Sequence, residues 1–242
     1  MPDVVAKPPF LCARNMTVII MLAVMGMLLA QGVPRLRAEL SKVVSRQPLS
    51  LVLSGEFPTD AGFDRIIRSH SRALRLMDDP VTSRELGLAY LSWSFVDLAE
   101  GDDASVNATR AREYLSRSLH QVPADGYAWY LRAQSAIVLG DVDQATAALA
   151  RSYRIVPFDF GNAATRLSVS LQLIDDLDIQ TVELVAAEVT MLATENVRAL
   201  ASTALAVGRP DEVLAILRVS DVGFDVITTY IDTVRRLMET TF

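Results

Sequence analysis

The sequence of 242 residues contains very little cysteine and histidine, and each shortage excludes a class of site. Cys12 is the only cysteine, so neither a disulfide framework nor a cysteine-based zinc site can form within one chain. The two histidines, His70 and His120, lie far apart, and neither has a carboxylate or cysteine at a metal-ligand spacing. We expect both histidines to be structural or surface residues, with no metal site and no bound cofactor.

Lysine is almost absent, and the formal net charge is −6 at pH 7. Because neutralisation of phosphates supplies most of the affinity for nucleic acid, an acidic chain without a lysine-rich tract is not expected to have a nucleic-acid partner. No Gly-x-Ser-x-Gly elbow is present. Asp159-Phe160-Gly161 spells the magnesium-binding tripeptide of kinases, but the glycine-rich loop and the catalytic loop are missing. We therefore expect no catalytic residues and no enzymatic activity.

Glycine and proline are also sparse, at 11 and 10 residues, whereas alanine, leucine and valine are abundant. This balance favours helices over a sheet with many turns. The sequence therefore predicts an all-α protein.

One apolar run stands out near the N-terminus. Residues 15–34 carry no charge, and a helix of about 20 residues matches a hydrocarbon core about 30 Å thick. We expect a transmembrane helix at 16–33, in contact with membrane lipid, after an N-terminal tail at 1–15. The alternatives are a cleaved secretory signal, which a cut after Ala30 would satisfy poorly because Leu28 is not small, and a buried helix of a soluble protein.

The orientation of this helix has two readings. The basic residues that come after it favour a cytoplasmic C-terminal domain. A short basic tail before a first apolar helix, with Lys7 and Arg14, is instead typical of a signal anchor that exports the domain on its C-terminal side. We expect a single-pass protein of a bacterial inner membrane, with its soluble domain in the periplasm and the cytoplasm as the alternative.

Residues 34–62 are expected to form a juxtamembrane segment and linker, punctuated by Pro48, Gly55, Pro58 and Gly62 around the short apolar piece at 49–53. Residues 63–242 then show helical periodicity and are expected to form one domain. The first helix is expected to end at Asp78-Asp79-Pro80. Thr82 and Glu85 fit a capping box at the start of the next helix, which is expected to end at about Ala99.

A 34-residue repeat lies inside this domain. Ala111, Leu115, Ser118 and Pro123 recur as Ala145, Leu149, Ser152 and Pro157, and Gly140 recurs as Gly208 after twice that interval. Periods of this length are typical of stacked helix pairs, because one pair cannot bury its apolar face alone.

Residues 126–157 resemble a tetratricopeptide repeat. Trp129 stands at the large aromatic position, Ala133 at the small position of the first helix, Gly140 at the turn, Ala145 and Leu149 on the inner face of the second helix, and Pro157 at the end of the unit. Arg132 and Ala136 depart from the pattern. The preceding unit carries Tyr90 and Ser94 at the aromatic and small positions, the unit at 160–193 departs at Ile179 and Glu183, and the unit from Glu195 carries Ala201, Gly208, Val213 and Leu217.

The resemblance covers about 82–220 and implies a right-handed stack of antiparallel helix pairs with a concave groove that receives a segment of another protein. The positions that it places in the partner-binding groove are Leu88, Leu91, Phe95, Tyr127, Tyr130, Gln134, Arg198 and Ser202. We therefore expect a membrane-anchored adaptor or scaffold for protein partners, which are themselves membrane-associated, in assembly of a bacterial envelope, secretion or polysaccharide system. The alternative is a structural accessory subunit that docks on a larger membrane complex through its transmembrane helix.

Overall fold

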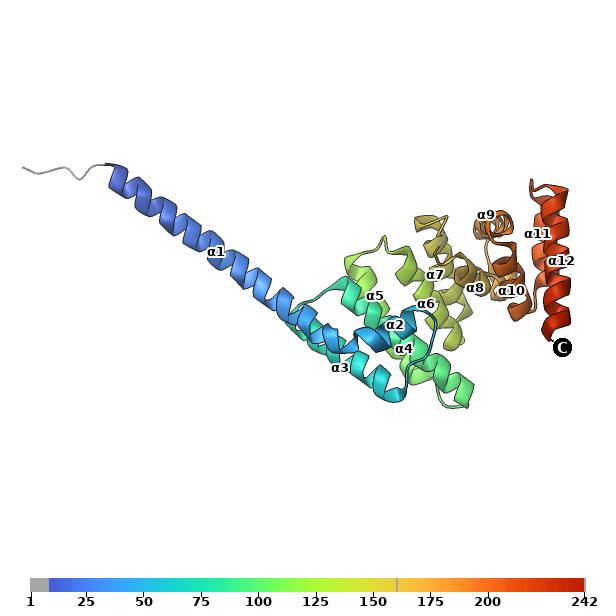
Figure 1. The fold of residues 1–242 in the computed structure, drawn as a ribbon, viewed down its shortest axis with the longest axis horizontal. Coiled ribbons are helices and arrows are strands. Elements are labelled where there is room, and N and C mark those ends of the chain that lie inside the picture. The colour runs from blue at the N-terminus through green and yellow to red at the C-terminus, as the bar shows by residue number, and fades with distance from the viewer. Residues whose placement is uncertain (1–8, 160, 242) are drawn as a thin grey trace, which may run out of the picture.

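A computed structural model describes the backbone of residues 9–159 and 161–241 (Figure 1). Within these residues the chain forms helices and turns and no strand, which confirms the all-α class. One long helix projects from a body of shorter helices (Figure 1). The expected tail at 1–15 lies outside the described residues over its first eight positions.

The projecting helix, α1, spans Pro9–Lys42 and contains Pro34. Its apolar side chains from Met16 to Leu29 are exposed, and Met21 reaches 69% exposure. It is the one helix of the described ranges that is long and apolar enough to cross a membrane, and a secretory signal has the same character. The alternative of a buried soluble helix does not fit, because apolar side chains of a core helix pack inside the body.

Residues 34–62 are more ordered than the expected linker. Helix α1 continues through Pro34, a 3₁₀ turn comes next at Val43–Ser45, and a short helix, α2, spans Arg46–Leu53. Pro48 and Val52 are buried, because α2 packs against α3 and α4 of the body. Val52 of the apolar piece at 49–53 therefore belongs to the core, and the segment fastens α1 to the body.

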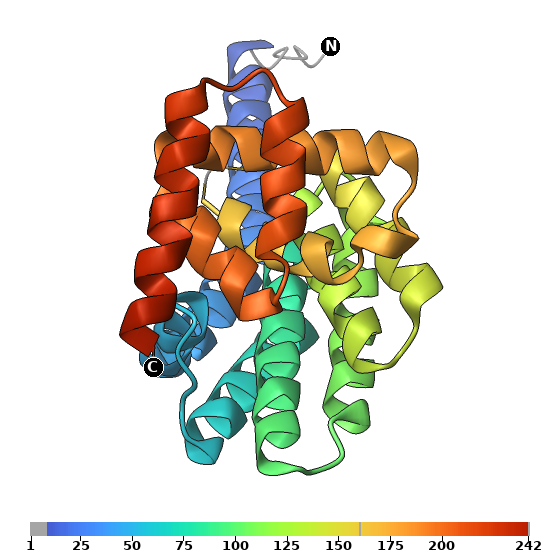
Figure 2. The ribbon, with the colours of Figure 1, turned by 90° about the vertical axis from the view of Figure 1, so that its right-hand side faces the viewer.

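The remaining helices pack as consecutive pairs, with the first helix of each pair contacting the first helix of the next, and α12 covers α10 and α11 at the end (Figures 1 and 2). Their bounds are α3 Asp60–Leu76, α4 Pro80–Glu100, α5 Ser105–Gln121, α6 Gly126–Val138, α7 Val142–Ile155, α8 Ala163–Gln172, α9 Ile179–Glu195, α10 Val197–Val207, α11 Pro210–Val219 and α12 Phe224–Thr241, with a 3₁₀ turn at Ile174–Asp176. This pairing is consistent with a helical-repeat fold.

The repeat positions mark the tightest parts of the packing. The alanines and leucines that recur are inaccessible to solvent: Ala111, Leu115, Ala133, Ala145, Leu149 and Ala201. Gly140 and Gly208 have φ of 71° and 74°, a left-handed backbone that residues with a Cβ rarely adopt. The 34-residue spacing therefore marks positions where helices approach closely, and its glycines mark the ends of α6 and α10.

The expected capping box at Thr82 and Glu85 is wrong. Asp79 is the N-cap of α4, and its carboxylate accepts the backbone N–H of Thr82 at 2.7 Å. Pro80 occupies the first turn, where its missing N–H is not needed. The side chain of Glu85 contacts His70 instead, with 3.1 Å between Oε2 and Nε2.

A buried polar cluster joins α7, α8 and α9. The Arg166 guanidinium donates two bonds to Oε1 of Glu188, at 3.1 and 2.5 Å, and the Tyr153 hydroxyl donates to Oε2 at 2.5 Å. Arg166 also donates to the carbonyls of Val156 and Pro157 and lies 4.1 Å from the centroid of the Tyr153 ring. All three side chains of the cluster are almost inaccessible to solvent. This cluster stands in the unit that departs from the repeat pattern, so charged groups replace part of its apolar core.

Candidate functional site

A groove opens between α4 and α6, and the chain's own segments before and after them complete its walls. Residues of α4 and α6 form one side, the end of α2 and the loop after it form another, and the start of α8 closes it. The lining residues are Val52, Leu53, Ser54, Gly55, Glu56, Phe57, Leu88, Ser92, Phe95, Tyr127, Tyr130, Leu131, Gln134, Gly161, Asn162 and Thr165.

Five of the eight sequence-predicted groove residues meet in this groove. Leu88 and Phe95 come from α4, and Tyr127, Tyr130 and Gln134 come from α6. Spacings of three, four and seven residues put side chains on one face of a helix, and the contact between α4 and α6 brings the two faces together. The resemblance and the helical period therefore point to one continuous surface.

The other three predicted residues lie elsewhere. Leu91 is inaccessible to solvent in the core, because the face of α4 that carries it packs against neighbouring helices. Arg198 and Ser202 are exposed on α10. Arg198 lines a separate hollow beside Thr233 and Arg236 of α12. The array therefore does not present all eight residues to one bound segment.

The two groove tyrosines lie side by side, with 5.9 Å between their ring centroids. Burial raises the pKa of the Tyr127 hydroxyl and, to a greater extent, that of Tyr130, so both stay protonated at neutral pH. The guanidinium of Arg84 lies 5.8 Å from the Tyr127 ring centroid and donates to Asp125 at 2.5 Å. Asp125 also accepts from the backbone N–H of Ala128 and caps α6. A capped helix and an ion pair therefore hold the tyrosines in place.

The end of α2 and the loop after it form one wall of the groove that the sequence pattern did not predict. Leu53 and Phe57 are 60% and 58% exposed, although both are large and apolar. They form an apolar lip opposite the tyrosines. The apolar piece at 49–53 was the available signal, but the surrounding prolines and glycines favoured a linker.

Trp129 does not reach the groove. The guanidinium groups of Arg132 and Arg151 lie over its ring, at 5.4 and 5.3 Å from the ring centroid, and its indole N–H donates to the Pro123 carbonyl at 2.9 Å. Arg132 therefore has a packing role at a position where the repeat pattern has leucine. Trp129 joins α6 to α7 and the turn before α6.

A second polar group surrounds the buried imidazole of His70. Nδ1 lies 3.0 Å from the Ile66 carbonyl and 3.2 Å from the Ser69 hydroxyl, and Ser45 is 3.5 Å away. Serine, histidine and Glu85 are the residue types of a nucleophilic triad. Both His70 and Ser45 are inaccessible to solvent, and their contacts tie the turn after α1 to α3 and α4. The described side chains contain no cluster of three His, Cys, Asp or Glu able to hold a metal ion.

Comparison of the chain with known proteins does not assign it to a family. The chain matches no model of a known protein family, no curated protein and no solved structure. The functional assignment therefore rests on two features of the molecule itself, the groove and the exposed apolar helix α1.

Proposed function

We propose that this protein is a membrane-anchored adaptor or scaffold that binds other proteins through the groove of a tetratricopeptide-like array. The packed helix pairs, the buried small residues at 34-residue intervals and the left-handed Gly140 and Gly208 support the assignment to that kind of array. Stacking of such pairs leaves a curved surface that suits an extended or helical segment of a partner.

The observation that carries the binding role is the convergence of Tyr127, Tyr130 and Phe95 on one open groove. Aromatic side chains are favoured as interface anchors, because they bury much area at a low cost in conformational entropy. Gln134 and Asn162 add amide groups that bind the backbone of a bound segment. The proposed partner segment is therefore a short peptide or helix with apolar side chains.

The test is capture of partners from detergent-solubilised membranes by the full-length chain. Tyr127→Ala removes an anchor from the groove and is expected to weaken capture about tenfold or more, as for a central interface aromatic. Tyr114→Ala is the matched control, because Tyr114 is a half-buried tyrosine of α5 that stacks on Tyr90 away from the groove. Equal capture by the two variants would refute the groove as the binding site.

The proposed anchor is α1. An anchored groove is confined near membrane-associated partners, and this confinement raises its effective concentration there. We place the protein in a bacterial inner membrane, with the body in the periplasm, where it serves assembly of an envelope, secretion or polysaccharide system. Long exported domains cross the membrane largely regardless of their charge, so the basic residues after α1 do not oppose this orientation strongly. A reporter fused after residue 242 tests this orientation. Activity of a reporter that works only in the cytoplasm would contradict the periplasmic location of the body.

A second proposed function is that of an accessory subunit that docks through α1 on a larger membrane complex. The exposure of the apolar side chains from Met16 to Leu29 of α1 supports it, and Gly26 leaves open space beside the helix for close approach of another helix. Replacement of 16–33 by an unrelated apolar span separates the two functions. An adaptor keeps its partners with the new anchor, whereas an accessory subunit loses them.

A further inference from the structure

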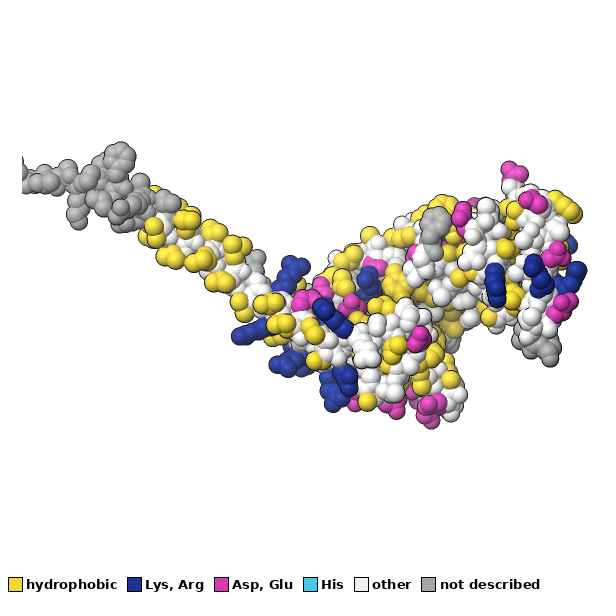
Figure 3. Space-filling view, viewed as in Figure 1, with side chains coloured by type: hydrophobic (Ala, Val, Ile, Leu, Met, Phe, Trp, Pro, Cys, Tyr) yellow, Lys and Arg dark blue, Asp and Glu magenta, His cyan; other side chains and the backbone are white. Residues whose placement is uncertain are grey.

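We propose that the arginines around the exit of α1 bind the anionic headgroups of membrane lipids and fix the body against the membrane surface. This inference rests on the proposed role of α1 as a membrane anchor. We call Arg35, Arg37, Arg72 and Arg75 the basic collar. Figure 3 shows basic side chains gathered where α1 meets the body.

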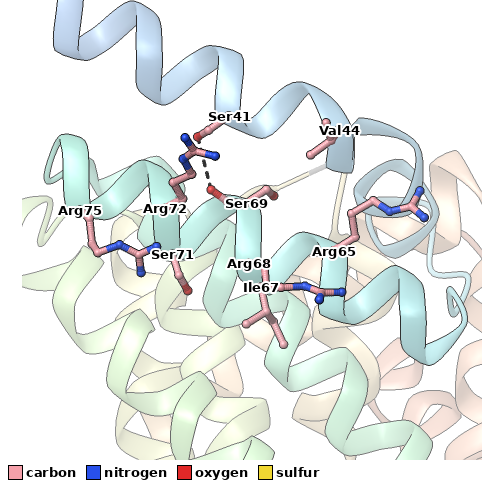
Figure 4. Close-up of a pocket in the computed structure, with 9 residues that line it drawn as sticks. All are labelled: Ser41, Val44, Arg65, Ile67, Arg68, Ser69, Ser71, Arg72 and Arg75. Carbon is pink, nitrogen blue, oxygen red and sulfur yellow. Dashed lines mark hydrogen bonds between the residues drawn. The ribbon is translucent and has the colours of Figure 1, made fainter.

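The collar is assembled from two helices that pack side by side. Ala38 of α1 is buried, and the Ser41 hydroxyl contacts the Ser69 carbonyl of α3 at 3.4 Å (Figure 4). Arg37 and Arg72 line one shallow hollow together with Leu40, Ser41 and Leu76. Arg75 lies one turn further along the exposed face of α3, beside Arg72 (Figure 4). Arg37 of α1 and Arg72 of α3 therefore lie beside each other where the two helices pack together.

The charge of the chain is divided between two regions. Residues 35–75 carry eight basic and four acidic side chains, a formal net charge of +4. Residues 76–242 carry thirteen basic and twenty-four acidic side chains, a net charge of −11. The body is therefore acidic, but residues 35–75 at the C-terminal end of α1 and on α3 form a positive region. The like charges of this region repel one another unless a bound anion neutralises them.

No ion pair within the described residues neutralises the collar. In the body, by contrast, arginines bridge helices to carboxylates, as Arg84 does to Asp125 and Arg117 to Asp78. Among the arginines of α3, only Arg68 has a carboxylate partner, Asp64 at 3.5 Å. The collar guanidinium groups therefore remain available to an external anion.

The distance from the apolar run selects lipid headgroups as that anion. Arg37 lies four residues after Val33, or about 6 Å along a helix axis. The headgroup layer on each side of the hydrocarbon core is about 5–8 Å thick. Arg37, and Arg72 beside it, therefore fall among the headgroups when α1 spans the bilayer, and a guanidinium binds phosphate through paired hydrogen bonds. A soluble acidic protein would have to displace those lipids to reach the same groups.

The test measures lipid preference on the full-length chain in neutral detergent. A fluorescent phosphatidylglycerol is titrated, and the phosphatidylcholine with the same acyl chains is the reference. Wild type is expected to bind the anionic lipid more tightly, with a preference that falls with added salt. Each surface arginine contributes roughly fivefold to attraction by anionic lipid, so Arg72→Gln/Arg75→Gln is expected to lower the preference by about 25-fold.

The matched control is Arg218→Gln/Arg236→Gln, which removes two exposed arginines far from α1 and is expected to keep the wild-type preference. Arg72 and Arg75 are themselves exposed, so unchanged helical circular dichroism is expected to show that the collar variant folds. An equal preference for phosphatidylglycerol in wild type and the collar variant would overturn the proposal that the collar binds anionic lipids. Extraction of the wild-type chain from membranes by alkaline carbonate would overturn the anchor as well, which separates the two failures.

Discussion

The buried cluster of Arg166 and Glu188 allows the sharpest prediction about stability. Arg166→Met removes both guanidinium bonds to Glu188 and the donors to the carbonyls of Val156 and Pro157. Glu188 is then left in the core with only the Tyr153 hydroxyl among its present partners. Removal of one partner from a buried ion pair costs about 3–5 kcal/mol, a large part of the roughly 5–15 kcal/mol that stabilises a typical domain.

The pH dependence of this loss has a definite sign. Burial raises the pKa of the Glu188 carboxyl above its usual value, and loss of Arg166 raises it further. A raised pKa in the folded state means that the variant is most stable below the unfolded pKa and loses stability as pH rises through the folded pKa. The destabilisation by Arg166→Met is therefore expected to be smaller at pH 5 than at pH 8.

The assay is urea unfolding of the full-length chain in detergent, followed by circular dichroism. Arg154→Met is the control, because Arg154 of α7 and Asp178, the N-cap of α9, pair at 3.3 Å through side chains that are each more than half exposed. An exposed pair contributes about 0–1 kcal/mol. The double variant Arg166→Met/Glu188→Leu removes both charges and is expected to regain about 2 kcal/mol of the single loss. The reasoning is refuted if Arg166→Met costs no more than the control.

Three further predictions concern helix ends. Asp79→Ala is expected to lower the free energy of unfolding by about 1 kcal/mol, because the N–H of Thr82 loses its acceptor, and an unchanged urea midpoint would show that this cap does not contribute. Gly140→Ala is expected to cost about 1–2 kcal/mol, because φ at this position is 71°; thermal unfolding at the wild-type temperature would contradict the strain. Thr181, whose backbone N–H donates to Oδ1 of Asp178 at 2.7 Å, lowers the pKa of the Asp178 carboxyl, so its stabilisation is present above the usual aspartate pKa and is lost as pH falls through the folded pKa. Asp178→Asn is expected to flatten the acid side of the stability profile, and parallel acid unfolding curves would contradict this linkage.

Five of the eight positions that the resemblance to a tetratricopeptide repeat implied for the groove line one groove, and helical periodicity explains why they lie together. Leu88, Phe95, Tyr127, Tyr130 and Gln134 share faces of their helices by spacing alone, and the structure brings these faces together. A sequence contains this information, since residues three, four or seven positions apart lie on one side of a helix whatever packs against it.

Leu91 shows where that reasoning stops. It has the spacing of a groove residue, but it is fully buried, because the angle between α4 and its neighbours decides which part of an apolar stripe stays open. The prediction that Arg198 and Ser202 line the groove is wrong for a related reason. They lie on α10, and the position of α12 gives Arg198 a different hollow. Small rotations between pairs accumulate along a stack, and no single unit determines them.

The unit at 160–193 was the weakest part of the repeat pattern, and its two departing residues, Ile179 and Glu183, are exposed in the structure. The core of this unit contains the ion pair of Arg166 and Glu188, which the repeat pattern did not predict. A buried ion pair depends on partners 22 residues apart in the chain. The repeat pattern therefore registers the departures at the surface and not the ion pair inside the core.

The sequence by itself determined the helical class, the apolar helix and the 34-residue interval, because these depend on composition, on length and on residues near one another in the chain. Tertiary structure alone decided that residues 46–57 form a wall of the groove and that Arg72 and Arg75 stand beside Arg37 at the exit of α1. Both results join segments more than 30 residues apart. Their proximity results from how α1 and α2 pack on the body, since burial of Ala38 and Val52 fixes those helices against α3 and α4.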